Sequence, residues 1–486
     1  MLALAAPVDN RIRTLPPRGL RPKVVDDLAP LGPRGAQLAP TVRCGVTVYD
    51  LIIRDATIIR SGGRVVADIA IEDGRIAHVG GNPAGGTKED IPGIGRFVIP
   101  GVIDSQVRFR KPGDARGRDW GLGSRAAVRS GVTTVVELPD GEPGIQSAAD
   151  VKAALDGAAK AAVCNVGVWV GITRENFDQV GEFVEAGAAA PLIHLDHGEG
   201  PLCLDEDHIR AVMRAAPGIV GVHAEDPALL AKGRRKWEAV EDPQHNDVRT
   251  PKAARASVER LIEIVKEVKR PVHLTSFSTS AELNLLDPHR GDLPISCSVA
   301  PHHLFLSVET SAKAGDTLKV NPPVRGELDR RALWSGIKRG RIDTFHSAHT
   351  PLSKESKSGG YWSAPEGLPG VDVLFLLLMS AVKHGRISLE RLVEMCCEAP
   401  AEIFGLTGKG SITEGADADL VVFSEGETTR LRKAPTISGV NWSPYVGREV
   451  GIPPRLVLVG GRVVSRDGEL VEDLKPAGRV QFNKKP

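Results

Sequence analysis

Hydrophobic and polar residues alternate near both ends of the chain, in a pattern typical of β-strands. From Tyr49 the chain reads YDLIIRDATII and then GRVVADIAIEDGRIAHVGG, with turn signals at Gly62-Gly63 and Asp73-Gly74. The same rhythm returns in DADLVVFSEG and PPRLVLVGGRVVSRDGELV near the other end. Successive side chains of a strand point to opposite faces of a sheet. We therefore predict one small β domain built from residues 49–99 and 410–475.

Between these segments, short apolar strands alternate with amphipathic helices. GVTTVVELP and NVGVWVGIT have the composition of buried strands, and Ser147 is a suitable N-cap for the helix that follows it. The helix expected in TPKAARASVERLIEIVKEV carries apolar residues at helical spacing, namely Val258, Leu261, Ile262, Val265 and Val268. Repeated β-then-α units over about 300 residues favour a closed parallel barrel. The predicted fold class is α/β, with a (β/α)8 TIM-type barrel at residues 100–409.

Composition restricts the classes of function. The chain has 486 residues, is 41% hydrophobic and 25% charged, and carries a net charge of +1, so it has no basic surplus that would predict nucleic-acid binding. No apolar run reaches the length of a membrane span, and Val371–Val382 is expected to be a buried helix. Residues 1–48 are rich in Pro and Arg and are expected to form a flexible extension. The cysteines show no CxxC motif, which predicts reduced thiols and a cytoplasmic location; they are Cys44, Cys164, Cys203, Cys297, Cys396 and Cys397.

The stretch IPGVIDSQVRFRKPG reads as a strand that leaves the core and turns at Pro112-Gly113. Gln106 and Arg108 lie two residues apart on it, so both side chains are expected on one face at the mouth of the barrel. Two histidines at this spacing would be metal ligands. Glutamine and arginine are not.

Nine motifs occur in the order and at about the spacing found in a known family. They are PGVIDSQVRFRKPG, GSRAAVRSGVTTVVELPD, GVHAEDPALL, VHLTSFST, SVAPHHLFL, KVNPPVR, GRIDTFHSAHTP, GLPGVDVLF and GSITEGADADLVVF. With them the chain resembles the dihydroorotase, hydantoinase and allantoinase branch of the amidohydrolase superfamily. The resemblance implies a TIM-type barrel flanked by a β-sandwich from both termini, which agrees with the pattern above.

The resemblance also implies a reaction and its ligands. Members hydrolyse cyclic amides with two zinc ions held by an HxH pair, a bridging lysine or aspartate and two further histidines, with an aspartate as general base. The matching positions here are Gln106, Arg108, Leu192, His223, Ser276 and Phe345, so one ligand in six is kept. We predict that no binuclear zinc site forms, that the Arg108 guanidinium lies near the vacated position, and that the chain has no catalytic residues and no cofactor.

The ligand-recognition positions are better preserved. The resemblance places substrate-binding residues at Arg110, Asp140, Asn321 and His349, of which only Asp140 departs from the family type. A carboxylate there would repel an anionic ligand. Two of these residues also have a purely structural explanation. Arg110 could form an ion pair in the barrel mouth, and Asn321 before Pro322-Pro323 could cap a turn. His302-His303 is expected to be structural, and His223 a hydrogen-bonded barrel histidine.

The sequence also allows an alternative hypothesis, in which a metal ion binds at different residues. LIHLDHGEG places His194 and Asp196 on one strand face with His197 adjacent. With His223, His346 or His349 they would form a mononuclear zinc site.

Three functions therefore remain. The preferred one is a non-catalytic dihydroorotase-like protein with a structural or regulatory role, which forms homo-oligomers and binds aspartate transcarbamoylase, as non-catalytic members of the family do. The second is an active cyclic amidohydrolase with zinc at His194, Asp196 and His223. The third is a metal-free ligand-binding or lyase-type protein that uses Arg108, Arg110 and His349.

Overall fold

The structure, a computed structural model, describes residues 48–111, 114–141, 143–424, 426–435, 437–478 and 482. Residues 47–486 form one compact unit. Nearly all of the predicted N-terminal extension, Cys44 and the Pro112-Gly113 turn lie outside the described residues. The five other cysteines are free thiols.

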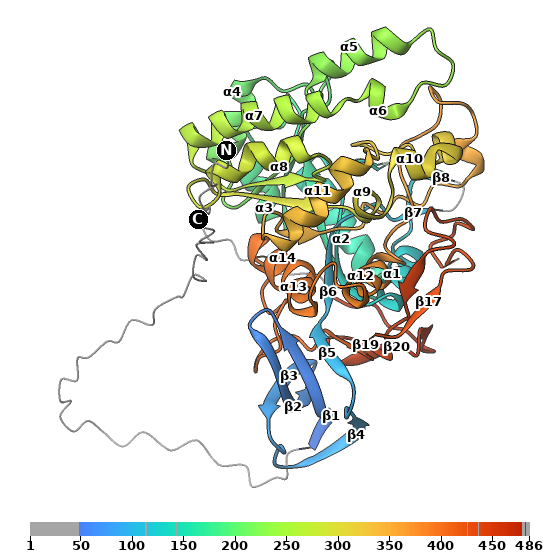
Figure 1. The fold of residues 1–486 in the computed structure, drawn as a ribbon. Coiled ribbons are helices and arrows are strands. Elements are labelled where there is room, and N and C mark those ends of the chain that lie inside the picture. Colours follow the sequence, from blue (N-terminus) through green and yellow to red (C-terminus); the bar gives the residue numbers. More distant parts are fainter. Residues whose placement is uncertain are drawn as a thin grey trace, which may run out of the picture. The chain divides into compact units, whose positions relative to one another are not determined.

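A nine-stranded sheet joins segments from both ends of the chain (Figure 1). Its central pairing is antiparallel and places Val421 opposite Ile99. Along these two strands Val98 and Val422 face one apolar cluster, whereas Ile99 and Val421 face the cluster shared with the barrel. The strands are β1 (Val48–Arg60), β2 (Gly63–Glu72), β3 (Arg75–Gly80), β4 (Gly86–Pro92), β5 (Phe97–Pro100), β16 (Leu420–Phe423), β19 (Leu456–Val459), β20 (Arg462–Arg466) and β21 (Glu469–Leu470). Their order is β21-β20-β19-β16-β5-β1-β2-β3, with β4 beside β1.

The turn between β2 and β3 forms where the sequence predicts it. Asp73 and Gly74 have φ values of 50° and 78°. Two consecutive positive φ values define the tight hairpin turn that Asp-Gly favours, because glycine has no Cβ to clash and aspartate tolerates this conformation.

Eight parallel strands form the barrel, which confirms the predicted TIM-type fold with an additional β domain. Consecutive strands are neighbours, and Val107 pairs with His349 to close the ring, where the Arg108 amide donates to the His349 carbonyl at 2.7 Å. The strands are β6 (Val102–Val107), β9 (Val132–Glu137), β10 (Asn165–Gly171), β11 (Ala190–His194), β12 (Val220–His223), β13 (Val272–Thr275), β14 (Ile295–Val299) and β15 (Thr344–Phe345).

Helices cover the outside of the barrel (Figure 1). They are α1 (Trp120–Arg129), α2 (Ala148–Ala161), α3 (Val180–Glu185), α4 (Glu206–Ala215), α5 (Pro227–Trp237), α6 (His245–Val248), α7 (Pro251–Val268), α8 (Ser280–Leu286), α9 (Pro301–Phe305), α10 (Val308–Ser311), α11 (Glu327–Lys338), α12 (Leu374–Lys383), α13 (Leu389–Val393) and α14 (Ala399–Ile403). Two short hairpins, β7 (Arg110–Lys111) with β8 (Asp114–Arg118) and β17 (Thr428–Arg430) with β18 (Glu449–Gly451), stand apart from both sheets.

Two helices, α7 and α2, show how the predicted sequence features appear in the structure. The predicted apolar stripe of α7 is buried at Val258, Leu261, Ile262 and Val265. Ser147 caps α2 by accepting a hydrogen bond from the Asp150 amide. No helix among the described residues is both long and apolar enough to cross a membrane.

Trp169 is the largest side chain of an apolar cluster that also contains Ile103, Val136 and Leu192. Trp169 is fully buried and donates its indole N–H to the Ser105 carbonyl at 2.8 Å. Gly221 on β12 makes room for the ring, because a Cβ at this position would lie 2.5 Å from it. The barrel is therefore a packed core below its mouth, and any ligand must bind above Trp169.

Gly221→Ala is expected to destabilise the protein. The added methyl group meets a ring that is enclosed on all sides, and overpacking of this kind costs about 1–3 kcal/mol. Urea unfolding followed by circular dichroism measures the change. Gly181→Ala in α3 is the control, because its Cβ enters open space and alanine favours a helix; equal effects of the two substitutions would contradict the packing argument.

Candidate functional site

A cavity of about 620 Å³ lies at the carboxyl ends of the barrel strands. In TIM-type barrels this end carries the functional loops. Most of the residues predicted from the sequence line it, namely Gln106, Arg108, Arg110, Asp140, Leu192, His194, Asp196, His197, His223, Ser276 and Asn321. Phe345, His346 and His349 do not.

Neutral hydrogen bonds connect the positions that resemble zinc ligands. Gln106 Nε2 donates to Ser298 Oγ at 3.2 Å, and Ser276 Oγ lies 3.5 Å from Gln106 Oε1. Ser276 Oγ also lies 3.1 Å from His346 Nε2. All four side chains are buried. Burial lowers the pKa of His346 well below its ordinary value, so this imidazole is neutral.

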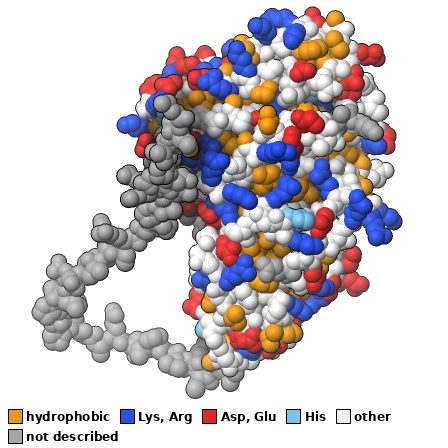
Figure 2. Space-filling model, viewed as in Figure 1, with side chains coloured by type: hydrophobic (Ala, Val, Ile, Leu, Met, Phe, Trp, Pro, Cys, Tyr) orange, Lys and Arg blue, Asp and Glu red, His pale blue; other side chains and the backbone are white. Residues whose placement is uncertain are grey.

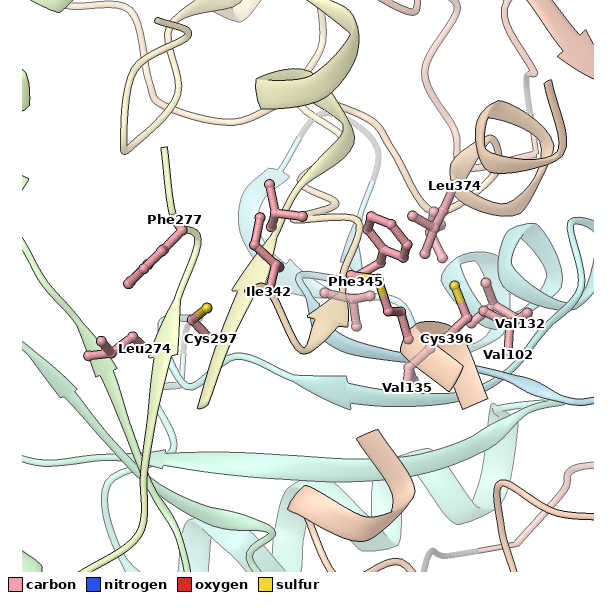
Figure 3. Close-up of a cluster of buried hydrophobic side chains, with 14 of the residues drawn as sticks. Val102, Val132, Val135, Leu274, Phe277, Cys297, Ile342, Phe345, Leu374 and Cys396 are labelled. Carbon is pink, nitrogen blue, oxygen red and sulfur yellow. The ribbon is translucent and has the colours of Figure 1, made fainter. Parts of the chain in front are cut away.

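Apolar side chains occupy two further positions. Leu192 is 1% exposed and lies in the cluster around Trp169. Phe345 is fully buried on the face of β15 that packs on α12, where its ring points toward Leu374 (Figure 3). Alternation along the strand turns the next residue, His346, toward Ser276. Neither Leu192 nor Phe345 can bind a cation or accept a proton.

His349 lies where the barrel closes: its backbone pairs with Val107, and its side chain binds backbone amides. Its Nδ1 accepts hydrogen bonds from the amides of Gly370 and Val371 at 3.0 and 3.3 Å. Burial, with a smaller effect of Arg110, lowers its pKa to about 3. The structure thus places a neutral His349 below the cavity wall, and its predicted contact with a ligand stays a prediction.

Arg108 and Arg110 meet carboxylates on neighbouring loops. Arg108 Nε donates to Asp140 Oδ2, and its Nη1 reaches Thr350 Oγ1 at 3.4 Å. Arg110 is 4% exposed and lies 3.4 Å from Glu137 Oε1, which Arg118 Nε also approaches at 3.2 Å. Asp140, which departs from the family type, therefore neutralises Arg108, and both structural and ligand-binding explanations of Arg110 remain open.

A second charged group lies where β11 and β12 end. His223 Nε2 is 3.2 Å from Glu225 Oε2 and 3.7 Å from Asp196 Oδ2. Arg249, from the connection between α6 and α7, bridges the same carboxylates, with Nη2 2.9 Å from Asp196 Oδ2 and 2.5 Å from Glu225 Oε2. Arg325 Nη2 approaches Glu225 Oε1 at 3.8 Å. Two carboxylates thus share two guanidiniums and one imidazole.

Electrostatics in this group favour the charged forms. Burial alone would raise the pKa of Glu225, but Arg249 and His223 lower it to about 2. Burial alone would lower the pKa of His223, but Asp196 and Glu225 raise it. A protonated His223 donates its N–H to Glu225 and offers no lone pair at that nitrogen.

The donor set does not fit a binuclear zinc centre. Zinc requires several imidazole or carboxylate ligands, and five of the six corresponding positions hold an amide, a guanidinium, a hydroxyl or hydrocarbon. A mononuclear ion has more suitable ligands, because donor atoms of Asp196, His223 and Glu225 lie within 4.8 Å of one another, as do those of His194, Asp196 and His197. Arg249 already neutralises the first group. His194 Nε2 and Asp196 Oδ1 are buried without a hydrogen-bond partner.

Asn321 is held by a neighbour. Its Oδ1 lies 3.0 Å from His245 Nε2, and His245 Nδ1 is 2.7 Å from the Tyr361 hydroxyl. The amide therefore faces the cavity as part of a fixed hydrogen-bond chain, which agrees with either of its predicted roles.

Sequence reasoning missed Glu225, Arg249 and Glu137. Glu225 stands two residues after His223 in the motif VHAED, a spacing that could have indicated a shared face. Arg249 lies in a connection with no motif of its own, and no signal in the sequence places it beside Asp196.

The comparisons with known proteins agree with this architecture. The Amidohydrolase family profile matches residues 97–464. The chain belongs to the amidohydrolase family. It is 35% identical to a dihydroorotase of Halobacterium salinarum, over 86% of this chain and 97% of that protein, and 30% identical to an allantoinase of Rubrobacter xylanophilus, over 89% and 98%.

Among solved structures, the amidohydrolase fold of this chain is similar to an L-hydantoinase from Arthrobacter aurescens. The TM-score is 0.82 at 23% identity, and the match covers 89% of this chain and all of that one. The predicted branch of the family is thereby confirmed. That Gln106, Leu192 and Phe345 stand at metal-ligand positions stays a prediction from the resemblance.

Arg249→Met is expected to destabilise the protein by about 3 kcal/mol, because it leaves two buried carboxylates without their main counter-charge. Adding Glu225→Gln should recover part of the loss, since one of those charges then disappears. Urea unfolding measures both variants. Arg255→Met is the control, because its ion pair with Glu259 on α7 is exposed and contributes little. Equal stabilities of the Arg249 and Arg255 variants would contradict the proposed network.

Proposed function

We propose that this amidohydrolase is a dihydroorotase-like protein that has lost the binuclear zinc site and does not hydrolyse cyclic amides. The observation that carries the proposal is the hydrogen-bonded set Gln106, Ser276, Ser298 and His346 at the vacated metal positions. Gln106, Ser276 and His346 form hydrogen bonds with one another, although His346 Nδ1 has no partner. These four side chains include no carboxylate and only one imidazole, which is too few ligands for a pair of cations.

The chemistry of the reaction supports the same conclusion. Hydrolysis of a cyclic amide needs a water whose pKa is lowered and a base that takes its proton and delivers it to the leaving nitrogen. Phe345 cannot be that base, and His346 is held in a neutral buried contact. Asp140, the nearest carboxylate to Arg108, is already in an ion pair with it.

The cavity remains able to bind a small molecule. Three guanidiniums, of Arg108, Arg110 and Arg249, line it together with the carboxylates of Asp140, Asp196 and Glu366. Lys319 neutralises Glu366 at 3.3 Å. This balance favours an uncharged or zwitterionic ligand over a dianionic acid, and it leaves Arg108, Arg110, Asp140 and Asn321 as the ligand-pocket candidates.

One observation favours an active hydrolase instead. Donor atoms of Asp196, His223 and Glu225 are close enough to hold one ion, and unpartnered atoms of His194 and Asp196 lie beside them. The identity to dihydroorotases also supports a hydrolase. In this second candidate function Asp196, His223 and Glu225 would hold one metal ion in place of the Arg249 contact, and such an ion would supply a water of lowered pKa.

Metal analysis and an activity assay on the same preparation separate the two functions. We expect well under one zinc per chain after purification without chelator, and no hydrolysis of dihydroorotate, hydantoin or allantoin. The Halobacterium dihydroorotase, assayed alongside, is the positive control. Two stoichiometric zinc ions with turnover would overturn the proposal, whereas one zinc ion with turnover would establish the second function.

A structural or regulatory role is the remaining part of the proposal. We expect a homo-oligomer that binds aspartate transcarbamoylase in the cytoplasm, because a non-catalytic barrel must act through its surface. Co-purification from the native cell, with and without a transcarbamoylase assay on the complex, tests this expectation. A monomer that leaves that activity unchanged would contradict it.

A further inference from the structure

A second cavity, of about 330 Å³, lies outside the barrel between α11, the end of α12 and the segment that precedes β18. It shares no lining residue with the barrel cavity. Figure 2 shows Lys and Arg side chains gathered over the part of the surface where Figure 1 places α11 and α12. We call it the arginine cavity, because Arg330, Arg386 and Arg448 line it.

Only one of these three arginines has a carboxylate partner within the described ranges. Arg330 forms two parallel contacts of 2.6 Å with Glu327. The Arg386 guanidinium lies over the Trp334 ring, 5.6 Å from its centre. Arg448 is half-buried and forms no ion pair with any residue that the structure describes. Two guanidiniums therefore bring uncompensated charge to one small cavity.

The carboxylate at the edge of the arginine cavity is already neutralised. Glu449 lies 3.0 Å from Lys383 Nζ and 3.1 Å from His384 Nε2, and it accepts a hydrogen bond from the Thr428 hydroxyl. Glu449 forms no ion pair with Arg448 or Arg386 in the described part of the chain. The two guanidiniums therefore give the cavity a positive potential that attracts an anion.

The titration behaviour agrees with crowding of positive charge. Partial burial is the main cause that lowers the pKa of both Arg386 and Arg448, and the charge of Arg330 lowers both further; Glu327 opposes the shift of Arg386, and Tyr445 opposes that of Arg448. Arginine stays charged in spite of such shifts, because its ordinary pKa is above 12. An anion that enters the cavity would therefore meet two charged guanidiniums.

The shape and the floor of the cavity restrict the ligand. Its volume is at the lower end of the range of small-molecule sites. Phe305 forms part of the floor and packs edge-to-face on Trp334, with ring centres 5.4 Å apart. Guanidiniums match the oxygens of a phosphate group in pairs of hydrogen bonds, while an aromatic floor accepts a flat apolar group.

We propose that the arginine cavity is a binding site for a phosphate-bearing small molecule, held by Arg448 and Arg386 with its organic part over Phe305. The phosphate oxygens accept hydrogen bonds from the two unpaired guanidiniums, while Arg330 keeps its contact with Glu327. Binding at this site is independent of the barrel cavity and of whether the barrel holds a metal.

Isothermal titration calorimetry of the full chain tests the site with three probes: inorganic phosphate, pyrophosphate and a set of nucleoside 5′-monophosphates. We expect at least one probe to bind with a stoichiometry of one. Arg448→Met should weaken that binding by about tenfold or more, since each lost contact is a hydrogen bond between two charged groups. If a nucleotide binds more tightly than pyrophosphate, its base contacts Phe305. If pyrophosphate binds more tightly than every nucleotide, the site binds inorganic anions.

Arg235→Met on α5 is the matched control, because this arginine is exposed and distant from the cavity in sequence and fold. It should bind as the unaltered chain does. Without any anion, Arg448→Met should be at least as stable as the unaltered chain, because a repulsive charge is removed; this measurement excludes unfolding as the cause of lost binding. Failure of every probe to bind, or undiminished binding by Arg448→Met, would overturn the proposal.

Discussion

The mouth of this barrel depends on the neutralisation of charges that have left water. A carboxylate buried without a partner costs several kcal/mol, and strands β9, β11 and β12 all end close to buried carboxylates. Glu137 is met by Arg110 and Arg118, and Asp196 and Glu225 are met by Arg249. These ion pairs tie the β7–β8 hairpin and the α6–α7 connection to the barrel. The loops that shape the cavity are therefore fixed by the same contacts that neutralise it.

The same requirement applies to the positions that resemble the metal ligands of the family. Zinc ions would supply positive charge where several strands end. Gln106, Ser276 and Leu192, which the resemblance matches to metal-ligand positions, are uncharged and buried, so their side chains need no counter-charge. Where carboxylates persist, at Asp196 and Glu225, a guanidinium stands beside them. In both places the charges of the described side chains are balanced within the chain itself.

Much of the fold could be predicted from the sequence because it depends on local periodicity. The apolar stripe of α7, the cap at Ser147 and the Asp73-Gly74 turn each follow from a few neighbouring residues. Several residues that line the mouth, such as Gln106, Arg108 and His223, were also predictable, since motifs carry them. The partners were not: Arg249 is separated from Asp196 by 53 residues, and Arg108 from Asp140 by 32. Which carboxylate a long arginine side chain contacts depends on how the loops at the barrel mouth are arranged in the folded protein. No short sequence pattern encodes that arrangement.

The two cavities differ in how completely their charges are matched. In the barrel mouth each arginine has a carboxylate of this chain, so a ligand must displace an existing ion pair or bind beside it. In the arginine cavity, Arg386 and Arg448 have no such partner among the described residues, while Glu449 is held by Lys383 and His384. An anion that binds there breaks no ion pair of Arg386 or Arg448. Affinity for anions in this chain is therefore expected to lie outside the barrel, although the fold alone would direct attention to its mouth.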